Sequence, residues 1–210
     1  MELNLHSSRK QYTSGELNEA NLPTEPTDLF LIWYHKAEQL EHFESNAMVL
    51  STVSDGKPSS RIVLLKEVTN GRFIFFTNYE SRKGREIGEN NAVALNFFWQ
   101  HLQRQIRIEG TATRIPESDS EQYFNERPLE SRISAIVSPQ SSVISSREIL
   151  EANISDFVKK NASVAKPSYW GGYAVTPLSI EFWQGRPNRL HDRIRYLKTD
   201  NGWQIDRLAP

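Results

Sequence analysis

The spacing of hydrophobic residues changes several times along the chain, and each change marks a predicted element. Apolar residues recur at helical spacing between residues 29 and 40, which predicts an amphipathic helix capped by Thr27. Between residues 47 and 115 apolar and polar positions mostly alternate, as in half-buried strands, with a helical break at residues 81–90. Asn70-Gly71 separates two of the apolar runs, and because both residues tolerate positive φ, the pair predicts a tight hairpin.

The second half of the chain passes from helices back to strands. Helices are expected at residues 118–128 and 147–160, with a polar-ended connector between them at 133–142. Four further strands are expected at residues 169–175, 178–185, 193–199 and 203–210. Together with the earlier runs these make at least seven strands. The pattern therefore predicts a mostly β, α+β fold: a closed or nearly closed antiparallel β-barrel with peripheral helices.

Residues 1–26 differ from the rest of the chain, because they are polar, end in Pro23 and Pro26, and offer few side chains that could anchor a core. We expect a mobile N-terminal arm there, followed by a single domain at residues 27–210. Arg9 and Tyr12 are the only pair in this arm that could reach a ligand. On composition alone, a disordered tail is the favoured interpretation of the segment.

Composition narrows the class of protein. The 210 residues carry 25 Lys and Arg against 26 Asp and Glu, a formal net charge of −1, so no global charge favours nucleic acid or an anionic membrane. The chain has no Cys and no apolar run of ~20 residues or apolar signal segment, so we expect a soluble, cytoplasmic protein without disulfides.

Several common kinds of catalytic site have no support in the sequence. The five His residues do not follow a metal-ligand spacing, and no Cys could assist them. The sequence also lacks the motifs GxSxG, GxxxxGK[ST] and GxGxxG, which argues against a serine hydrolase, a P-loop and a Rossmann dinucleotide site.

Cations cluster in the stretch from Arg61 to Lys83. Arg61 and Lys66 flank an apolar strand, and Arg82 and Lys83 follow Ser81 where a helix is expected to begin. Free backbone N–H groups at a helix start favour anions, and four cations around two buried strands need a polyanionic partner. A phosphorylated ligand is the obvious candidate. Spacing alone equally allows a solvated helix face formed by Arg82, Lys83 and Arg85, with Lys66 as an ordinary charge at a strand end.

A second group of polar and aromatic residues lies between Glu181 and Arg193. If this segment is extended, Arg189, His191 and Arg193 share one strand face, with Trp183 nearby in the sequence. Three cationic or potentially cationic groups on one face predict an anion or an electron-rich ring opposite them. The alternative is an exposed basic edge strand that discourages aggregation.

Many short motifs, in this order, resemble the pyridoxine/pyridoxamine 5′-phosphate oxidase family. They are RIVLLK, the SRK of YESRK, the RQ of QRQIRIEG, YFNERP with Ser131, QSS at residues 140–142, the WGG at Trp170, EFWQG, RLHDR and the terminal IDRLAP. The resemblance covers nearly the whole chain, from Arg9 to Pro210. It implies an FMN-binding split barrel and a homodimer that holds the flavin at the subunit interface. It also implies oxidation of pyridoxamine or pyridoxine 5′-phosphate to pyridoxal 5′-phosphate by dioxygen, with hydrogen peroxide as by-product.

Residue by residue, the resemblance implies three sets of contacts. Those to FMN are Arg61, Ile62, Val63, Leu64, Leu65, Lys66, Phe76, Thr77, Arg82, Lys83, Gln105, Gln140, Ser141, Trp183 and Arg193. Those to the substrate are Arg9, Lys10, Gln11, Tyr12, Lys66, Tyr123, Arg127, Ser131, Arg189, Leu190 and His191, and Arg189 and His191 are implied as catalytic. This chain departs at position 76, where an aromatic with a hydroxyl is frequent, and at Pro139, where a cation would be expected.

The implied mechanism is hydride transfer from the 4′ carbon of the substrate to the flavin, followed by reoxidation with dioxygen. A non-catalytic flavin or pyridoxal phosphate binding protein of the same fold is the main rival. Such a protein would not need YFNERP with Ser131, or RLHDR, so their presence favours the enzyme.

Overall fold

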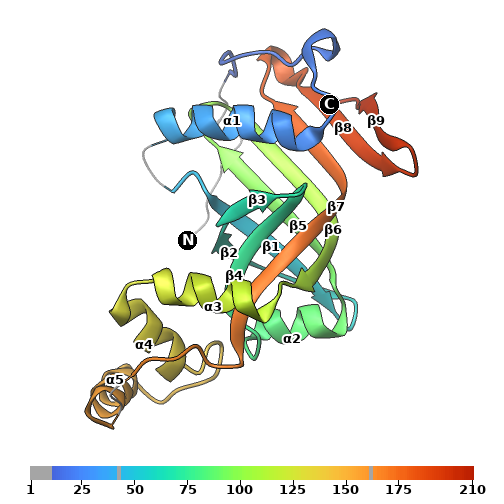
Figure 1. The fold of residues 1–210 in the computed structure, drawn as a ribbon. Coiled ribbons are helices and arrows are strands. Elements are labelled where there is room, and N and C mark those ends of the chain that lie inside the picture. The colour runs from blue at the N-terminus through green and yellow to red at the C-terminus, as the bar shows by residue number, and fades with distance from the viewer. Residues whose placement is uncertain (1–10, 42–43, 161–162) are drawn as a thin grey trace. The chain divides into compact units, whose positions relative to one another are not determined.

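The structure is a computed structural model that describes residues 11–41, 44–160 and 163–210 (Figure 1). Its helices are α1 (Pro26–Leu40), α2 (Arg82–Glu89), α3 (Glu117–Glu126), α4 (Leu129–Val137) and α5 (Glu148–Lys160), with short 3-10 turns η1 (Glu19–Asn21) and η2 (Pro187–Arg189). Its strands are β1 (Ala47–Ser54), β2 (Lys57–Leu64), β3 (Glu67–Thr69), β4 (Arg72–Asn78), β5 (Ala92–Trp99), β6 (Arg104–Arg114), β7 (Trp170–Gln184), β8 (Asp192–Thr199) and β9 (Gly202–Arg207). None of the described helices is long and apolar enough to cross a membrane.

The chain divides into two compact units, and neither is one continuous segment. Unit 1 comprises residues 1–49, 94–109 and 177–210, and unit 2 comprises residues 50–93 and 110–176. Strands β1, β5, β6 and β7 each continue from one unit into the other. The single domain expected at residues 27–210 stays a prediction.

Helix α1 supplies the apolar centre of unit 1. Phe30 lies 5.2 Å from Phe97 between ring centroids, and Trp33 lies 5.3 Å from Phe182. Such edge-on aromatic pairs add to the burial of large apolar surfaces. The predicted capping by Thr27 is wrong, because the helix already begins at Pro26, whose fixed φ suits a first helical turn.

The described part of the N-terminal arm contacts the rest of unit 1. Leu17 is buried, and its backbone N–H donates to Asp192 Oδ2 at 3.1 Å. Tyr12 packs edge-on against Trp183, with 5.8 Å between ring centroids. Arg9 and Lys10 lie outside the described residues, and the mobility of the arm stays a prediction.

Strands β8 and β9 form the antiparallel hairpin at the end of the chain, drawn in red in Figure 1. Because β8 also pairs with β7, from Ser179 opposite Leu197 to Gln184 opposite Asp192, both of its edges are occupied. The alternative interpretation of this segment as a basic edge strand is therefore wrong.

Two predicted strands near the end of the chain are in fact the single long strand β7. The predicted break falls at Pro177, which lacks the N–H that a sheet ladder needs. In the structure, β4 pairs with β7 as far as Val175, and β8 pairs with it only from Ser179 onward. Pro177 thus lies between two pairing partners, where the missing N–H interrupts neither ladder.

Unit 2 contains the predicted hairpin, formed by β3 and β4. Asn70 and Gly71 adopt φ of 50° and 72°, as the turn requires. Strand β4 is almost wholly buried, as expected, but no residue of β2 is buried and its Ile62 is 63% exposed. The prediction of two buried strands between the cations is therefore right for β4 and wrong for β2.

The helices of unit 2 begin and end at recognisable residues. The helix expected to begin near Ser81 is α2, and Ser81 caps it, because its side chain accepts the backbone N–H of Gly84 at 3.2 Å. Residues 129–137 form α4, so the first half of the predicted connector at 133–142 is helical. Pro128 precedes this helix and Pro139 follows it, which explains why it is short.

Gly84 gives a direct test of the packing beneath α2. A Cβ on Gly84 would lie 2.5 Å from the carbonyl carbon and 2.7 Å from the Cα of Tyr79, and both atoms belong to rigid backbone. Gly84→Ala should therefore lower the free energy of unfolding by about 1–3 kcal/mol, measured by denaturant titration.

The matched control is Gly88→Ala on the same helix, where a Cβ would meet nothing within 4 Å. This change should be neutral or raise the free energy of unfolding by up to ~1 kcal/mol, because Ala is the better helix former. Equal stability of the two variants would contradict the close packing of α2 on Tyr79.

Candidate functional site

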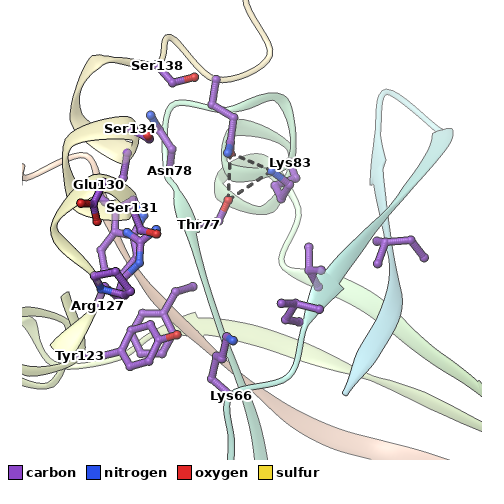
Figure 2. Close-up of a pocket in the computed structure, with 18 residues that line it drawn as sticks. Lys66, Thr77, Asn78, Lys83, Tyr123, Arg127, Glu130, Ser131, Ser134 and Ser138 are labelled. Carbon is purple, nitrogen blue, oxygen red and sulfur yellow. Dashed lines mark hydrogen bonds between the residues drawn. The ribbon is translucent and has the colours of Figure 1, made fainter. Parts of the chain in front are cut away.

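A cavity of about 770 Å³ lies within unit 2, among β2, β4, α3, α4 and the first residue of β7, Trp170. Figure 2 shows its polar side chains, with Arg127 and Ser131 on one wall and Lys83 with Thr77 on another. The predicted site residues that line it are Ile62, Val63, Leu64, Lys66, Phe76, Thr77, Lys83, Tyr123, Arg127, Ser131 and Gln140. Residues far apart in the sequence thus meet at one cavity.

The junction of α3 and α4 explains the position of Arg127. Arg127 ends α3 with extended backbone, φ −71° and ψ 148°, as expected for a residue that precedes proline. Pro128 then opens α4, so Ser131 falls in the first turn of that helix, where backbone N–H groups have no partner within the helix. A cation, a hydroxyl and a helix start therefore face the same cavity.

Arg127 has an unused donor in this wall. Its Nη1 is buried and makes no hydrogen bond to any described residue. Burial lowers the pKa of Arg127, although the nearby Tyr123 opposes this shift. Since a buried, unpaired guanidinium nitrogen is costly, this atom needs an acceptor, and the oxygens of a phosphate would supply one.

An aromatic stack supports the same wall. Phe76 lies 3.9 Å from Tyr123 and 5.4 Å from Trp170 between ring centroids, in both cases nearly parallel. The guanidinium carbon of Arg127 lies 4.8 Å above the ring of Trp170. Gly172 permits this packing, because a Cβ there would come within 2.9 Å of Phe76. Trp170 had no predicted role, although the WGG motif pointed to its position.

Lys83, Thr77 and Gln140 form the second polar wall. The amide oxygen of Gln140 accepts from Lys83 Nζ at 2.9 Å and from Thr77 Oγ1 at 3.2 Å. Burial, reinforced by the charge of Arg61, lowers the pKa of Lys83 to about 8. Lys83 therefore remains mostly charged at neutral pH, and a nearby anion would strengthen that charge.

A second cavity of about 490 Å³ adjoins this wall and shares Lys83 with the first. Its lining includes three further predicted residues, Arg61, Arg82 and Ser141. Ser141 adopts φ 70°, a left-handed conformation that is uncommon for a serine. Of the unit 2 residues predicted to bind FMN, only Leu65 lines neither cavity, because its side chain is buried in the core.

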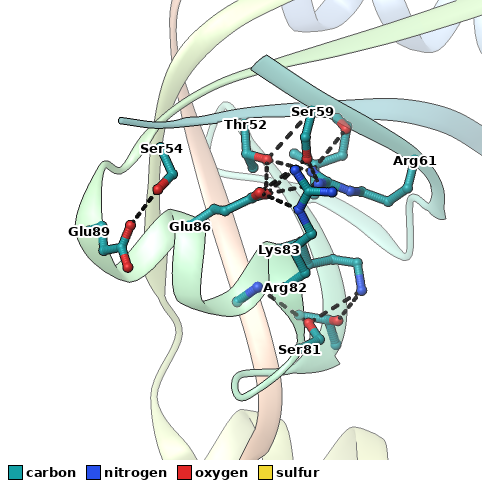
Figure 3. A network of polar contacts seen from close by, with 12 residues as sticks. Thr52, Ser54, Ser59, Arg61, Ser81, Arg82, Lys83, Glu86 and Glu89 are labelled. Atoms are coloured by element: carbon teal, nitrogen blue, oxygen red, sulfur yellow. Dashed lines mark hydrogen bonds and ion pairs between the residues drawn. The ribbon is translucent and has the colours of Figure 1, made fainter. Parts of the chain in front are cut away.

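Glu86, which the sequence analysis missed, lies between two of these cations (Figure 3). It accepts from Arg61 Nη2 at 2.9 Å and from Arg82 Nε at 2.8 Å. The prediction that the cations could be balanced only by a bound polyanion is therefore too strong. The helical spacing of Arg82 and Glu86 was a signal for this pair.

Cations, hydroxyls and apolar surface in these two cavities suit a phosphorylated, ring-containing ligand such as FMN. The unpaired Nη1 of Arg127 suits an anionic oxygen, and the neighbouring apolar side chains suit a flat ring. Among the described residues, no group of three His, Asp or Glu side chains could hold a metal ion.

The other predicted residues belong to unit 1, where Tyr12, Trp183 and His191 form an aromatic group. Ring centroids lie 4.6 Å apart for Trp183 and His191, and 5.8 Å apart for Tyr12 and His191. His191 Nδ1 accepts the backbone N–H of Arg186 at 3.1 Å, so its Nε2 carries the proton. Burial, and then the charge of Arg189, lower the pKa of His191, which keeps the ring neutral at pH 7.

The predicted strand face with three cations is wrong. Arg189 lies in η2 with φ 64°, and β8 begins only at Asp192, so the segment is not extended. Arg193 is paired within the protein, because it forms two hydrogen bonds with Glu181, at 2.8 and 3.1 Å. Of these three side chains, only that of the exposed Arg189 makes no hydrogen bond to a described residue.

Three more predicted residues of unit 1 occupy separate positions. Gln105 is half-buried on β6, and Gln11 accepts the backbone N–H of Asn188 at 3.2 Å. Leu190 is 69% exposed beside Arg189. The described site residues therefore form two groups, one in each unit.

Residues 36–160 match the family described as pyridoxamine 5′-phosphate oxidase. Residues 170–210 match the family described as the pyridoxine 5′-phosphate oxidase C-terminal dimerisation region. A pyridoxine/pyridoxamine 5′-phosphate oxidase of Bacteroides thetaiotaomicron is 50% identical to this chain, and 99% of each chain is covered. The enzyme of the same name from Cytophaga hutchinsonii is 46% identical over the full length of both.

Solved structures have the same fold. PhzG from Burkholderia lata, in complex with tetrahydrophenazine-1-carboxylic acid, is 30% identical with a TM-score of 0.87, over 92% of this chain and 98% of PhzG. A pyridoxamine 5′-phosphate oxidase-related, FMN-binding protein from Nostoc punctiforme is 16% identical with a TM-score of 0.71, over 90% of this chain and 99% of that protein. These likenesses confirm the predicted antiparallel split-barrel class. With two matching family descriptions and relatives of about half identical sequence, the chain belongs to the pyridoxine/pyridoxamine 5′-phosphate oxidase family, which is a family of enzymes.

Proposed function

We propose that this protein oxidises pyridoxamine 5′-phosphate or pyridoxine 5′-phosphate to pyridoxal 5′-phosphate, with FMN as cofactor and dioxygen as electron acceptor. The observation that carries the proposal is the cavity in unit 2, where two separate polar walls offer cations and hydroxyls. Cofactor and substrate each bring one phosphate, so the reaction requires two such places. The buried, unpaired Nη1 of Arg127 supports an anion at one of them.

FMN would occupy the side of the cavities formed by β2, β4 and α2. Arg61, Arg82, Lys83 and Ser141 line the second cavity and would hold its phosphate. Ile62, Val63 and Leu64 of β2 would lie along the ring system, and Gln140 would be a polar neighbour. Bound FMN supplies the redox chemistry: it takes two electrons from the substrate and passes them to dioxygen, which becomes hydrogen peroxide.

The substrate phosphate would bind at the junction of α3 and α4. Lys66, Tyr123, Arg127 and Ser131 all line this part of the cavity. Binding energy at the phosphate is distant from the reacting 4′ carbon, so it can hold that carbon in place without taking part in the chemistry. The stack of Trp170 under Arg127 would keep the guanidinium in one orientation.

The group in unit 1 would orient the pyridine ring. His191 presents its Nε2–H as a donor, because Nδ1 is already occupied by the Arg186 N–H. Arg189 is exposed and would extend over the substrate, and Tyr12 with Gln11 would help to close the site. Gln105, Trp183 and Arg193 would contact FMN from this unit.

We further propose that two copies of the chain share each site. The unit 1 and unit 2 groups would then come from different copies within a symmetric dimer, giving two equal sites. The match of residues 170–210 to a dimerisation region supports this arrangement, because the segment contains Trp183, Arg189 and His191.

Arg127→Ala tests the phosphate anchor. The variant loses a charge-assisted contact worth about 1.5–3 kcal/mol, so the KM for pyridoxamine 5′-phosphate should rise by about 10- to 100-fold. FMN content should stay normal, since the proposed FMN residues lie elsewhere. The matched control is Arg147→Ala, an exposed arginine paired with Glu151, which should change neither quantity. An unchanged KM in Arg127→Ala would remove Arg127 from the substrate site.

Arg189→Met tests the catalytic role of the exposed arginine. Met keeps much of the side-chain length but removes the charge and every donor. FMN should remain bound, and substrate should reduce it about 10- to 1000-fold more slowly, the scale of one well-placed polar group. Single-turnover absorbance at saturating substrate measures this rate. Arg195→Met, on β8 and paired with Asp206, is the control and should behave as wild type.

Mixing Arg127→Ala with Arg189→Met separates a shared site from one formed within a single chain. After joint unfolding and refolding of equal amounts, half of the dimers are mixed, and each mixed dimer has one intact site of two if sites are shared. At substrate concentrations well below the KM of Arg127→Ala, activity should then recover to about a quarter of wild type. No recovery above the two separate variants would contradict sites that combine two copies.

A further inference from the structure

Glu86 is a buried carboxylate that no proposed contact uses directly. It lies on α2 and is only 6% exposed. Figure 3 shows it surrounded by donors, with Thr52 and Ser59 on β1 and β2. Thr52 Oγ1 donates to its Oε2 at 2.5 Å and Ser59 Oγ at 3.0 Å. Burial by itself raises the pKa of Glu86, but hydrogen bonds from these hydroxyls and from Arg82 and Arg61 outweigh it and lower the pKa to about 2.

The same carboxylate fixes Arg61. Arg61 Nη2 donates to Glu86 Oε2 at 2.9 Å and also to Ser59 Oγ, while Nη1 donates to Thr52 Oγ1 at 2.6 Å and to the Leu50 carbonyl at 3.4 Å. Four of its five N–H groups are therefore used within the protein, and only the Nε–H remains. Arg61 therefore contributes a fixed positive charge to the second cavity, and few free hydrogen-bond donors.

Arg82 is held differently. Its Nε donates to Glu86 Oε1 at 2.8 Å, and this is its one hydrogen bond to the described side chains. Both Nη groups are left for a ligand, in the fork that matches two phosphate oxygens. Because the side chain is 63% exposed, little else limits its many rotamers.

The charges in this cluster suit a phosphate. Two guanidinium groups and one carboxylate leave one positive charge, and Lys83 in the same cavity adds a second. A phosphate monoester carries about −1.5 to −2 at pH 7. Glu86 therefore reduces the repulsion between the cations without reversing the positive charge of the cavity.

We infer that Glu86 is a positioning residue for the cofactor phosphate: it holds Arg61 and Arg82 in the geometry that binds the phosphate of FMN. This inference rests on the proposed function, because it assumes that the second cavity takes that phosphate. A carboxylate beside a phosphate site could instead compete with the ligand for the arginines. Positioning outweighs competition here, because each oxygen of Glu86 binds one arginine and leaves the outer edge of Arg82 unused.

Glu86→Gln tests the inference through the affinity of the apoprotein for two ligands. Gln is close in size to Glu but carries no charge, and its NH₂ group would face an arginine donor. The Kd for FMN should rise about tenfold, the effect of losing one charge-assisted hydrogen bond that orders an arginine. The Kd for riboflavin, which lacks the phosphate, should change less than about twofold. Quenching of flavin fluorescence measures both constants.

Glu89→Gln is the matched control, because Glu89 lies on the same helix but accepts from Ser54 Oγ at 2.6 Å and contacts neither arginine. It should change neither constant. Thr52→Val provides a milder second variant if Glu86→Gln does not fold. It keeps the carboxylate but removes the hydroxyl that bridges Glu86 and Arg61, so it should weaken FMN by about threefold and leave riboflavin unchanged.

Each remaining outcome is decisive. Equal losses for FMN and riboflavin would mean that Glu86 has only a structural role, and tighter FMN binding would mean that it competes with the phosphate. Unchanged FMN binding in Glu86→Gln, with wild-type protein that prefers FMN to riboflavin, overturns the inference alone. Wild-type protein without that preference would instead contradict the FMN phosphate site and with it the proposed function.

Discussion

A guanidinium group taken out of water needs an anionic or polar acceptor, and this need organises both units of the protein. In unit 2, Glu86 satisfies Arg61 and holds Arg82, and in unit 1, Glu181 satisfies Arg193. Arg127 is the contrast, since its buried Nη1 has no acceptor among the described residues. The internally paired arginines therefore help to define the shape of the site, and the unpaired Nη1 of Arg127, which lines the cavity, indicates where a ligand would supply the missing charge.

Local features of the chain put these groups in place. Ser81 caps α2, and Gly84 lets this helix lie against the backbone of Tyr79. This packing places Arg82 and Lys83 at the cavities, with Glu86 paired to Arg82. Pro128 lies between the end of α3 and the start of α4, and this short junction lets Arg127 and Ser131 face the same cavity. Small changes in these caps and close contacts should act on ligand binding as well as on stability.

Structural features that depend on the local sequence pattern could be predicted from the sequence. The Asn70-Gly71 hairpin and the helix that begins after Ser81 are confirmed, as is the antiparallel fold class. Predictions were wrong where tertiary contacts decide the structure. Pro177 does not end β7, because it lies between the pairings with β4 and β8, and α4 includes residues that were predicted to be a connector.

The candidate site was predictable to a similar degree. Motifs identified the residues at the cavities, but they could not reveal that Glu86 pairs two of the cations or that Trp170 lies beneath Arg127. The i,i+4 spacing on α2 signalled the Arg82–Glu86 pair, but the contacts of Glu86 with Arg61 and of Arg127 with Trp170 join residues far apart in the sequence and depend on three-dimensional distances. The roles given to Arg189 and His191 likewise rest on resemblance, because their segment is a turn rather than the expected strand.

The most direct test of the account is the visible spectrum of the purified, FMN-loaded protein before and after pyridoxamine 5′-phosphate is added without oxygen. We expect the flavin absorbance to disappear, because the substrate gives its two electrons to FMN, and to return when oxygen is admitted, with hydrogen peroxide formed in equal amount. An unchanged spectrum at full FMN occupancy and saturating substrate would contradict an oxidase acting on this substrate.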